Sequence, residues 1–437
     1  MISVDQRRLA FPIPLHPDSV NMLRHLCLSV CIVFPLVVAA ADWPQFRGPA
    51  GNGHAEARNL PMEWGPDKNV AWRTEVPGKG WSSPCLAQGR IYLTSAVPVE
   101  EGSASGDVAL SLFCFDAKSG KELWSQSVFR QDGKTAPAIH RKNSHASPTP
   151  LVDGSRIFVH FGHQGTACLS TAGQIVWKNQ TNQYPPVHGN GGSPVLVDGL
   201  LIFSCDGGSD PFVVALDATT GDTKWRYARP TDSAKKFAFS TPEVITVGGR
   251  QQLITPGAGM VSALDPQSGE EIWRVTYDGY SVIPKPVYGN GLVYLSTGYD
   301  SPTIIAIRPD GHGDVTDTHV AWTLEKGAPH TPSPLLVGKE LYLVADRGAA
   351  SCVDATSGKV IWQKRVPGDY SASPLFADGR IYLVNEEGTG TVLRPGRTFE
   401  KLAENGFPER TLASYAVADG ALFVRTEKAL YRVEQAP

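Results

Sequence analysis

A nine-residue phrase, Asp-x-x-[Ser/Thr]-Gly-x-x-x-Trp, returns four times in this chain. The copies occupy residues 116–124, 217–225, 265–273 and 354–362. A fifth copy, 170–177, is one residue shorter and has Ser in place of the Asp. Such self-similarity is the signature of a repeat architecture, in which each repeat is one supersecondary unit that packs on its neighbours. The phrase therefore constrains the fold more strongly than composition does.

Each phrase joins two predicted strands. A short apolar run such as 213–216 precedes the phrase, and the strand that carries the Trp follows it. The Asp bonds its own backbone and the Gly accepts a positive φ, so these two residues form the turn. Upstream, Ser-Pro or Ser-x-Pro leads to an Asp-Gly pair between apolar runs, which is a strong hairpin signal. One unit is then a four-stranded antiparallel sheet of about 40–50 residues, the size of a propeller blade.

Eight such units can be counted from the residues that open their first strands. These residues are Ser83, Ser147, Ser193, Thr241, Pro286, Ser333, Ser373 and Tyr415. The eighth unit, 414–433, has chain for only about three strands, and a lone strand with a Trp, 70–73, precedes the first unit. We therefore predict an all-β, eight-bladed β-propeller of four-stranded antiparallel blades whose ring is closed by the N-terminal strand. Closure removes an exposed sheet edge.

The Trp of the phrase lies at a fixed distance from the turn, so its role should be the same in every blade. We expect these residues to be structural anchors rather than ligand contacts. The set is Trp72, Trp124, Trp177, Trp225, Trp273, Trp322 and Trp362.

The N-terminal residues indicate export. Residues 1–41 are interpreted as a signal peptide, with a possible start at Met22, an apolar run over 26–38 and a small-residue cleavage site at 39–41. The run is too short for a comfortable membrane span. Residues 42–68 then form an N-terminal arm and 69–437 the propeller. We expect a periplasmic or envelope protein, monomeric and without a membrane span in the mature chain.

Charge and cysteines limit the chemistry. The formal net charge is −3 with no basic block, which argues against nucleic acid as a partner. The mature chain keeps an odd number of cysteines, and small buried positions between blades are the favoured interpretation. These are Cys85, Cys114, Cys168, Cys205 and Cys352. His160 and His163 are interpreted as unrelated, and the acidic, Gly-rich turn 310–314 as a solvated hairpin rather than a calcium loop.

The repeated phrase resembles the PQQ-like (pyrroloquinoline quinone) propeller repeat, and the likeness covers about residues 69–433. Segments 42–49, 142–150, 308–314 and 370–374 are similar to exported PQQ-like proteins of planctomycete-type bacteria. One branch of this repeat is the quinoprotein dehydrogenases, which hold PQQ and calcium in the ring centre. Another is non-enzymatic and includes the propeller lipoprotein of the outer-membrane β-barrel assembly machine. The resemblance implies a fold and an exported address, and no particular substrate.

The residues just before the first-strand signatures are rich in aromatic and imidazole side chains. In a propeller, the loops that enter the innermost strands form one rim of the central channel. We therefore predict a binding rim there, with side-chain packing of a narrow channel mouth as the alternative. The predicted rim is Trp81, His145, His188, Phe239, Tyr280, His330 and Tyr370, with Tyr415 as the eighth position.

The quinoprotein alternative requires a calcium site. Calcium takes six to eight oxygen ligands, including carboxylates. Near the rim the sequence offers Asn143, Asn190 and Asp278, which do not form an obvious set, and no two cysteines are adjacent. We expect no metal site, no catalytic residues and no cofactor. The hypothesis is a non-enzymatic scaffold that binds envelope proteins or a ligand, and the alternative is a PQQ- and calcium-dependent dehydrogenase acting on alcohols or sugars.

Overall fold

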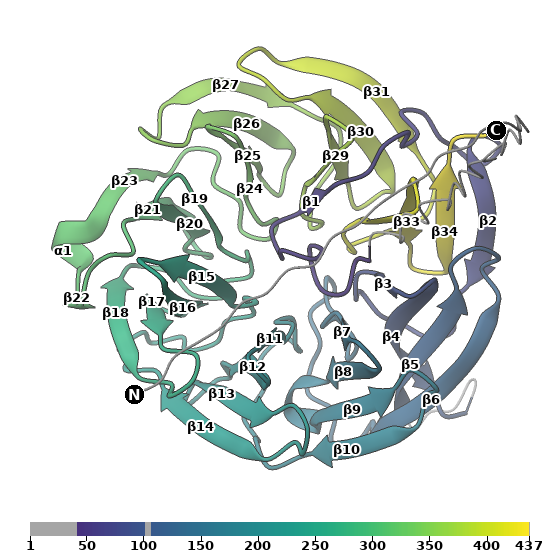
Figure 1. The fold of residues 1–437 in the computed structure, drawn as a ribbon, viewed down its shortest axis with the longest axis horizontal. Coiled ribbons are helices and arrows are strands. Elements are labelled where there is room, and N and C mark those ends of the chain that lie inside the picture. The colour runs from purple at the N-terminus through teal and green to yellow at the C-terminus, as the bar shows by residue number, and fades with distance from the viewer. Residues whose placement is uncertain (1–41, 101–105, 437) are drawn as a thin grey trace, which may run out of the picture. The chain divides into compact units, whose positions relative to one another are not determined.

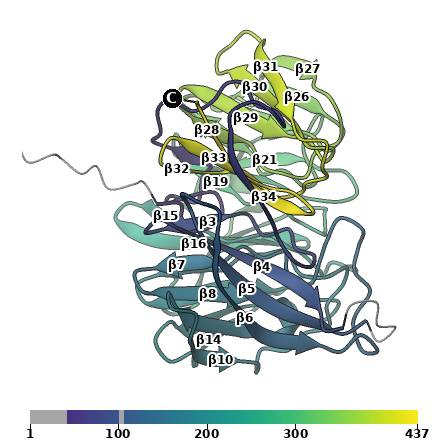
Figure 2. The ribbon, with the colours of Figure 1, turned by 90° about the vertical axis from the view of Figure 1, so that its right-hand side faces the viewer.

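The computed structural model describes residues 42–100 and 106–436, and within them it is a ring of eight radial β-sheets (Figure 1). The predicted eight-bladed, all-β propeller is confirmed. In Figure 2, strands β4, β5 and β6 of the first blade lie side by side. The predicted signal peptide, 1–41, lies outside the described residues. Among the described residues, no helix is long and apolar enough to cross a bilayer.

The first four blades follow one another along the chain, each with its innermost strand first. Blade 1 contains β3 (Cys85–Ala87), β4 (Arg90–Pro98), β5 (Val108–Asp116) and β6 (Glu122–Gln131). Blade 2 contains β7 (Leu151–Asp153), β8 (Arg156–His160), β9 (Thr166–Ser170) and β10 (Ile175–Asn179). Blade 3 contains β11 (Val195–Val197), β12 (Leu200–Cys205), β13 (Phe212–Asp217) and β14 (Thr223–Ala228). Blade 4 contains β15 (Glu243–Val247), β16 (Arg250–Gly257), β17 (Met260–Leu264) and β18 (Glu271–Thr276).

The remaining blades continue the same order. Blade 5 contains β19 (Val287–Gly289), β20 (Leu292–Ser296), β21 (Ile304–Ile307) and β23 (Val320–Leu324). Blade 6 contains β24 (Leu335–Val337), β25 (Glu340–Val344), β26 (Ala349–Asp354) and β27 (Val360–Arg365). Blade 7 contains β28 (Leu375–Ala377), β29 (Arg380–Val384), β30 (Thr389–Arg394) and β31 (Glu400–Gly406). Blade 8 has three strands from the C-terminus, β32 (Ala416–Ala418), β33 (Ala421–Arg425) and β34 (Ala429–Glu434).

The fourth strand of blade 8 comes from the other end of the chain. Strand β2 (Val70–Glu75) pairs antiparallel with β34, in register from Val70 opposite Val433 to Glu75 opposite Ala429. The closing strand is therefore where the sequence predicts it. The hydrophobic core lies mainly between neighbouring blades, since one buried cluster unites Leu112 of blade 1 with Val159 of blade 2 and another unites Ile254 of blade 4 with Leu295 of blade 5.

The repeated phrase links each blade to the one before it. Its Asp closes the turn, as Asp217 shows by accepting the backbone N–H groups of Thr219 and Thr220. Its Gly has a positive φ, 80° at Gly221, and a Cβ there would lie 2.6 Å from the ring of Trp177 of the preceding blade. Gly is thus required twice, by the backbone conformation and by the close approach of the ring.

The Trp side chain completes this contact with a hydrogen bond. The Nε1–H of Trp177 donates to the carbonyl of Ala218 at 3.1 Å, and that of Trp225 donates to Pro266 at 3.0 Å. Trp72, Trp322 and Trp362 make the equivalent bond to the next blade. Trp273, which is fully buried, bonds Gln252 of its own blade instead, and the Nε1 of Trp124 has no partner among the described residues.

We expect Trp225→Ala to lower the free energy of unfolding by about 2–3 kcal/mol, somewhat less than for a fully buried Trp, because the side chain is half-buried. The measurement is urea unfolding followed by circular dichroism. Trp225→Phe is the matched control: it keeps a ring over Gly269 and loses only the bond to Pro266, worth about 1 kcal/mol. An unchanged midpoint for the Ala variant would show that the residue is not an anchor.

The N-terminal arm runs across the middle of the ring (Figure 1). Trp43 exchanges backbone hydrogen bonds with Leu86 in blade 1, and the carbonyl of Pro44 accepts the N–H of Val152 in blade 2. The arm then reaches blade 7, where β1 (His54–Ala55) pairs in parallel with β28. The arm therefore joins the first two blades to the seventh across the channel.

The acidic turn in blade 5, predicted to be a solvated hairpin, keeps Asp310 and Asp314 exposed and also pairs with the neighbouring blade. Its residues form β22 (Gly313–Asp314), which pairs in parallel with β18 of blade 4, followed by the short helix α1 (Thr316–His319). His312 also reaches the carbonyl of Ile272 at 2.6 Å. The extra residues between β21 and β23 thus cover the outer edge of the neighbouring blade. The five cysteines of the described residues are all buried and unpaired, as the favoured interpretation requires.

Candidate functional site

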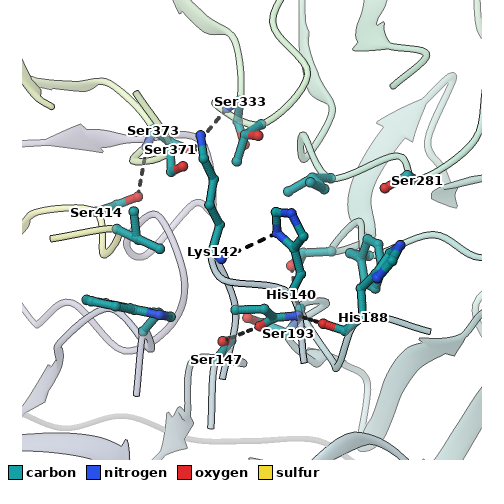
Figure 3. A pocket seen from close by; sticks show the side chains of 18 of the residues that line it. His140, Lys142, Ser147, His188, Ser193, Ser281, Ser333, Ser371, Ser373 and Ser414 are labelled. Carbon is teal, nitrogen blue, oxygen red and sulfur yellow. Dashed lines mark hydrogen bonds between the residues drawn. The ribbon is translucent and has the colours of Figure 1, made fainter. Parts of the chain in front are cut away.

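A cavity of about 300 Å³ lies on the axis of the ring, and we call it the axial funnel (Figure 3). Every blade contributes to it near the start of its innermost strand. The lining residues are Phe46, Trp81, Ser83, His140, Lys142, Asn143, Ser147, Thr149, His188, Gly191, Ser193, Phe237, Phe239, Thr241, Tyr280, Ser281, Ile283, Tyr299, Thr331, Ser333, Ser371, Ser373, Leu412 and Ser414. Phe46 comes from the arm that crosses the channel, so the arm supplies part of the funnel wall.

One side of the funnel is bordered by a chain of rings in mutual contact. His140 lies 5.7 Å from His188, and His188 lies 5.4 Å from Phe237, measured between ring centroids. The chain continues from Phe237 to Tyr280 at 5.6 Å. It then passes through Tyr299 to His330. Edge-on and tilted contacts of this kind stabilise aromatic pairs, so we call this continuous wall the aromatic arc.

The other side of the funnel carries the charged groups. Lys142 Nζ lies 2.6 Å from the Glu386 carboxylate, which also accepts a hydrogen bond from Ser371 at 2.6 Å. The Arg410 guanidinium lies 5.4 Å above the ring of Trp81. Lys142 is carried by the loop before blade 2, whereas Glu386 follows β29 of blade 7, so this ion pair joins two distant parts of the ring.

The structure separates the predicted rim residues into two groups. Trp81, His188, Phe239 and Tyr280 line the axial funnel. The other three predicted residues, His145, His330 and Tyr370, do not line it.

Where a predicted residue does not line the funnel, a neighbouring residue of the same loop can line it instead. Tyr370 is fully buried between blades 6 and 7, and Ser371 faces the cavity in its place. Tyr415 is likewise buried, against Trp64 of the arm. His330 packs on Tyr299 at the end of the aromatic arc without lining the cavity, while Thr331 lines the funnel.

Several lining residues escaped the sequence-based prediction. His140 and Lys142 belong to the long connection between blades 1 and 2, and Tyr299 belongs to the connection after β20. Phe237 lies two residues before the predicted Phe239. The only sequence signal for Phe237 is its closeness to Phe239, another aromatic residue in the same loop. Burial and the neighbouring charges of His188, Arg141 and Lys142 lower the pKa of His140, which favours the neutral imidazole.

The donor set of the funnel does not fit a calcium ion. Its lining contains no Asp or Glu, and Asn143 is its single carboxamide. The Asn143 side chain is already engaged, because its Nδ2 donates to the His188 carbonyl and its Oδ1 accepts from Ser147. Asn190 lies outside the funnel wall and Asp278 does not line it. No group of three or more His, Cys, Asp or Glu within 42–100 and 106–436 is arranged to hold a metal.

A second polar cluster lies between blades 2, 3 and 4. Arg229 Nε donates to Asp206 at 2.7 Å, and both side chains are fully buried. Burial raises the pKa of Asp206 and lowers that of His160 to about 3, so His160 is neutral near pH 7. The adjoining cavity of about 10 Å³ has room for about one water. His163 belongs to a separate 3-10 turn, 162–164. This cluster is a buried network in which one Asp206 carboxylate oxygen accepts from Arg229 and the other has no partner among the described residues.

Comparison with known proteins places the chain in one family. The family described as outer membrane protein assembly factor BamB matches residues 108–308, 210–342 and 313–397. BamB from Burkholderia pseudomallei is 27% identical over 53% of this chain and 65% of its own length. The quinohemoprotein alcohol dehydrogenase ADH IIB of Pseudomonas putida is 26% identical over 67% of this chain and 41% of its own.

Solved structures agree on the fold. The chain resembles BamB from Moraxella catarrhalis with a TM-score of 0.56 at 12% identity, covering 83% of this chain and 99% of that one. It also resembles the quinohemoprotein alcohol dehydrogenase ADHIIG from Pseudomonas putida HK5, with a TM-score of 0.61 at 11% identity, covering 90% and 80% of the two chains. The chain spans between 27% and 65% of the lengths of the curated relatives that it matches. It belongs to the BamB family of PQQ-like β-propellers.

Proposed function

We propose that this chain is an exported, non-enzymatic propeller that serves as a binding scaffold in the cell envelope, with the axial funnel as its binding site. The observation that carries the proposal is the chemistry of the funnel wall. Aromatic rings and hydroxyl groups line it, and no carboxylate does. Aromatic side chains supply much of the binding energy at interfaces, whereas a calcium-dependent dehydrogenase needs carboxylate oxygens around its calcium ion.

The alternative is a PQQ- and calcium-dependent dehydrogenase, favoured by the quinoprotein relatives. The two functions differ in a direct test. The purified protein is mixed with PQQ and calcium chloride, and its absorbance and its dye-linked oxidation of alcohols and sugars are recorded. The scaffold proposal expects no turnover. Sustained oxidation that requires both additions would overturn it.

Partner capture tests the scaffold directly. Trp81→Ala combined with Phe237→Ala removes two half-buried rings that line the funnel. We expect this double variant to keep its melting temperature within a few degrees and to lose most capture of envelope proteins in a pull-down. The matched control, Leu123→Ala with Val176→Ala, removes apolar side chains that are exposed on the outer strands β6 and β10. Equal capture by both double variants would move the binding site away from the funnel.

A further inference from the structure

The funnel contains a girdle of hydroxyl groups that is bonded from blade to blade. The backbone N–H of Ser83 donates to the hydroxyl of Thr149 at 2.9 Å, and the N–H of Thr149 donates to Ser193 at 2.9 Å. The same relation continues from Ser193 to Thr241 at 2.9 Å. Each inner strand is therefore joined to the next by a side-chain hydroxyl at the same position.

The girdle resumes at blade 6 and returns to its start. The N–H of Ser333 donates to Ser373 and that of Ser373 to Ser414 (Figure 3). The N–H of Ser414 donates to Ser83. One position breaks the pattern, since blade 5 has Lys285, whose N–H donates to Ser333 but whose side chain bonds Gly51 and Glu243 of the arm region and blade 4. The girdle hydroxyls are those of Ser83, Thr149, Ser193, Thr241, Ser333, Ser373 and Ser414.

Each girdle hydroxyl has an O–H donor that the protein does not use. A hydroxyl offers one donor and two acceptor sites, and in each of these residues an acceptor site is filled by a backbone N–H. None of the O–H groups has an acceptor among the described residues. All seven residues line the funnel, and the most exposed of them, Ser414, is only 7% exposed. Buried donors without acceptors cost free energy, so this array favours an acceptor in the cavity.

The funnel lining does not repel a carboxylate, and the hydroxyl donors of the girdle favour one over a neutral acceptor. The funnel lining holds no Asp or Glu that would repel an anion, and its one ammonium, Lys142, already pairs with Glu386 behind the wall. Convergent hydroxyl donors stabilise an ionised acceptor better than a neutral one, because hydrogen bonds to charged groups are about twice as strong. The aromatic arc beside them suits a flat apolar group. The arm residue Phe46 also lines the funnel, and the arm is bonded to blade 7 by the N–H of Phe376 and the carbonyl of Gly53.

We propose that the axial funnel is a socket for a single carboxylate carried on an aromatic group, with the carboxylate on the girdle hydroxyls and the ring against the aromatic arc. This inference rests on the proposed function, since it names what the binding site recognises. Two sources carry this chemistry: the free C-terminus of a partner chain that ends in an aromatic residue, and a free aromatic acid.

The test compares a peptide acid with its amide, which differ only in the terminal acceptor, and with a free aromatic acid. Binding of acetyl-Gly-Phe with a free carboxylate, of its C-terminal amide and of 2-naphthoate is measured by isothermal titration calorimetry on the full chain. We expect the free acid to bind about tenfold or more tightly than the amide, as a charge-assisted bond predicts. Tighter binding of the peptide acid than of 2-naphthoate would indicate a chain terminus, and the reverse a free acid. Equal affinity for acid and amide, or no binding of either acid, overturns the proposal.

Girdle variants separate a ligand contact from a structural effect. Ser373→Ala should weaken the peptide acid about tenfold and leave the amide unchanged, whereas a general loosening of the ring would weaken both. Ser373→Thr keeps the hydroxyl, as Thr149 does at the same place in blade 2, and should retain the preference for the acid. The control Ser357→Ala removes a hydroxyl on an outer turn, where it bonds Asp354, and should change neither affinity. If Ser373→Ala binds the acid as well as the natural chain, the girdle is not the carboxylate site.

The outcomes keep the two proposals apart. If the double variant Trp81→Ala and Phe237→Ala loses its partners but acid and amide bind equally, the scaffold stands and the carboxylate socket falls. If the acids bind selectively but partner capture is unaffected by that variant, the socket stands and the funnel is not the site at which the scaffold binds its partners.

Discussion

A chain that begins at residue 80 is expected to lose its cooperative unfolding transition and to aggregate. Such a chain lacks β2, so the outer face and edge of β34 become exposed. It also loses the ring of Trp72 over Gly120 and the 2.7 Å hydrogen bond from Thr74 to the Gly120 carbonyl, which join blade 8 to blade 1. Size-exclusion chromatography and thermal melting by circular dichroism measure the result.

A chain that begins at residue 69 is the matched comparison. It keeps β2 but lacks the arm, including Trp43, Leu60 and Trp64, which are buried in the core cluster at the ring closure. We expect it to remain a folded monomer with a lower melting temperature, because the closing strand is retained while buried apolar surface is lost. If the chain from residue 80 is instead monomeric and as stable as the full chain, the ring does not depend on β2.

The blades were predictable because their chemistry is local and repeated. A turn such as 217–221 contains its own Asp and Gly, and the Trp that follows is spaced to reach the next blade. The number of blades follows from the count of repeated units. The closing strand follows from the missing strand of the last unit and the lone strand before the first. The period also predicted that blade 8 would lack one strand.

The contents of the funnel were less predictable because its loops do not repeat. Lys142 reaches Glu386 and Asn143 reaches His188 through a connection that has no counterpart in the other blades. Aromatic residues next to the first strands were a useful signal, yet a shift of one residue decides whether Tyr370 or Ser371 faces the cavity. Register at that scale depends on packing between blades, which the sequence pattern does not specify.

The sequence shows the hydroxyl girdle only as a strand signature. The Ser of Ser193-Pro194 and Ser373-Pro374 marks the start of an inner strand. Its recurrence had a second reason, since the hydroxyl accepts the backbone N–H of the preceding blade. A polar residue that recurs at one position of every repeat points to a contact between repeats as well as to a turn.

The arm could not be placed from sequence, and its anchor is a buried group of charges. Glu243 forms an ion pair with Lys285, whose Nζ also donates to the Gly51 carbonyl of the arm at 2.9 Å. Arg47 of the arm lies beside them, 2% exposed, and donates to the carbonyl of Pro334 at 2.7 Å. Burial raises the pKa of Glu243 and lowers that of Lys285, and the charge of each partner opposes this effect.

Glu243→Gln is therefore expected to lower the free energy of unfolding by about 3–5 kcal/mol, because it leaves two buried cations without their carboxylate. Urea unfolding measures the loss. Glu404→Gln is the control, since its ion pair with Lys401 is exposed and is worth about 0–1 kcal/mol. Adding Lys285→Met to Glu243→Gln removes one of the two buried cations that lack a carboxylate. The double variant should therefore recover part of the lost free energy of unfolding. If Glu243→Gln is no more harmful than Glu404→Gln, the buried charges do not hold the arm across the channel.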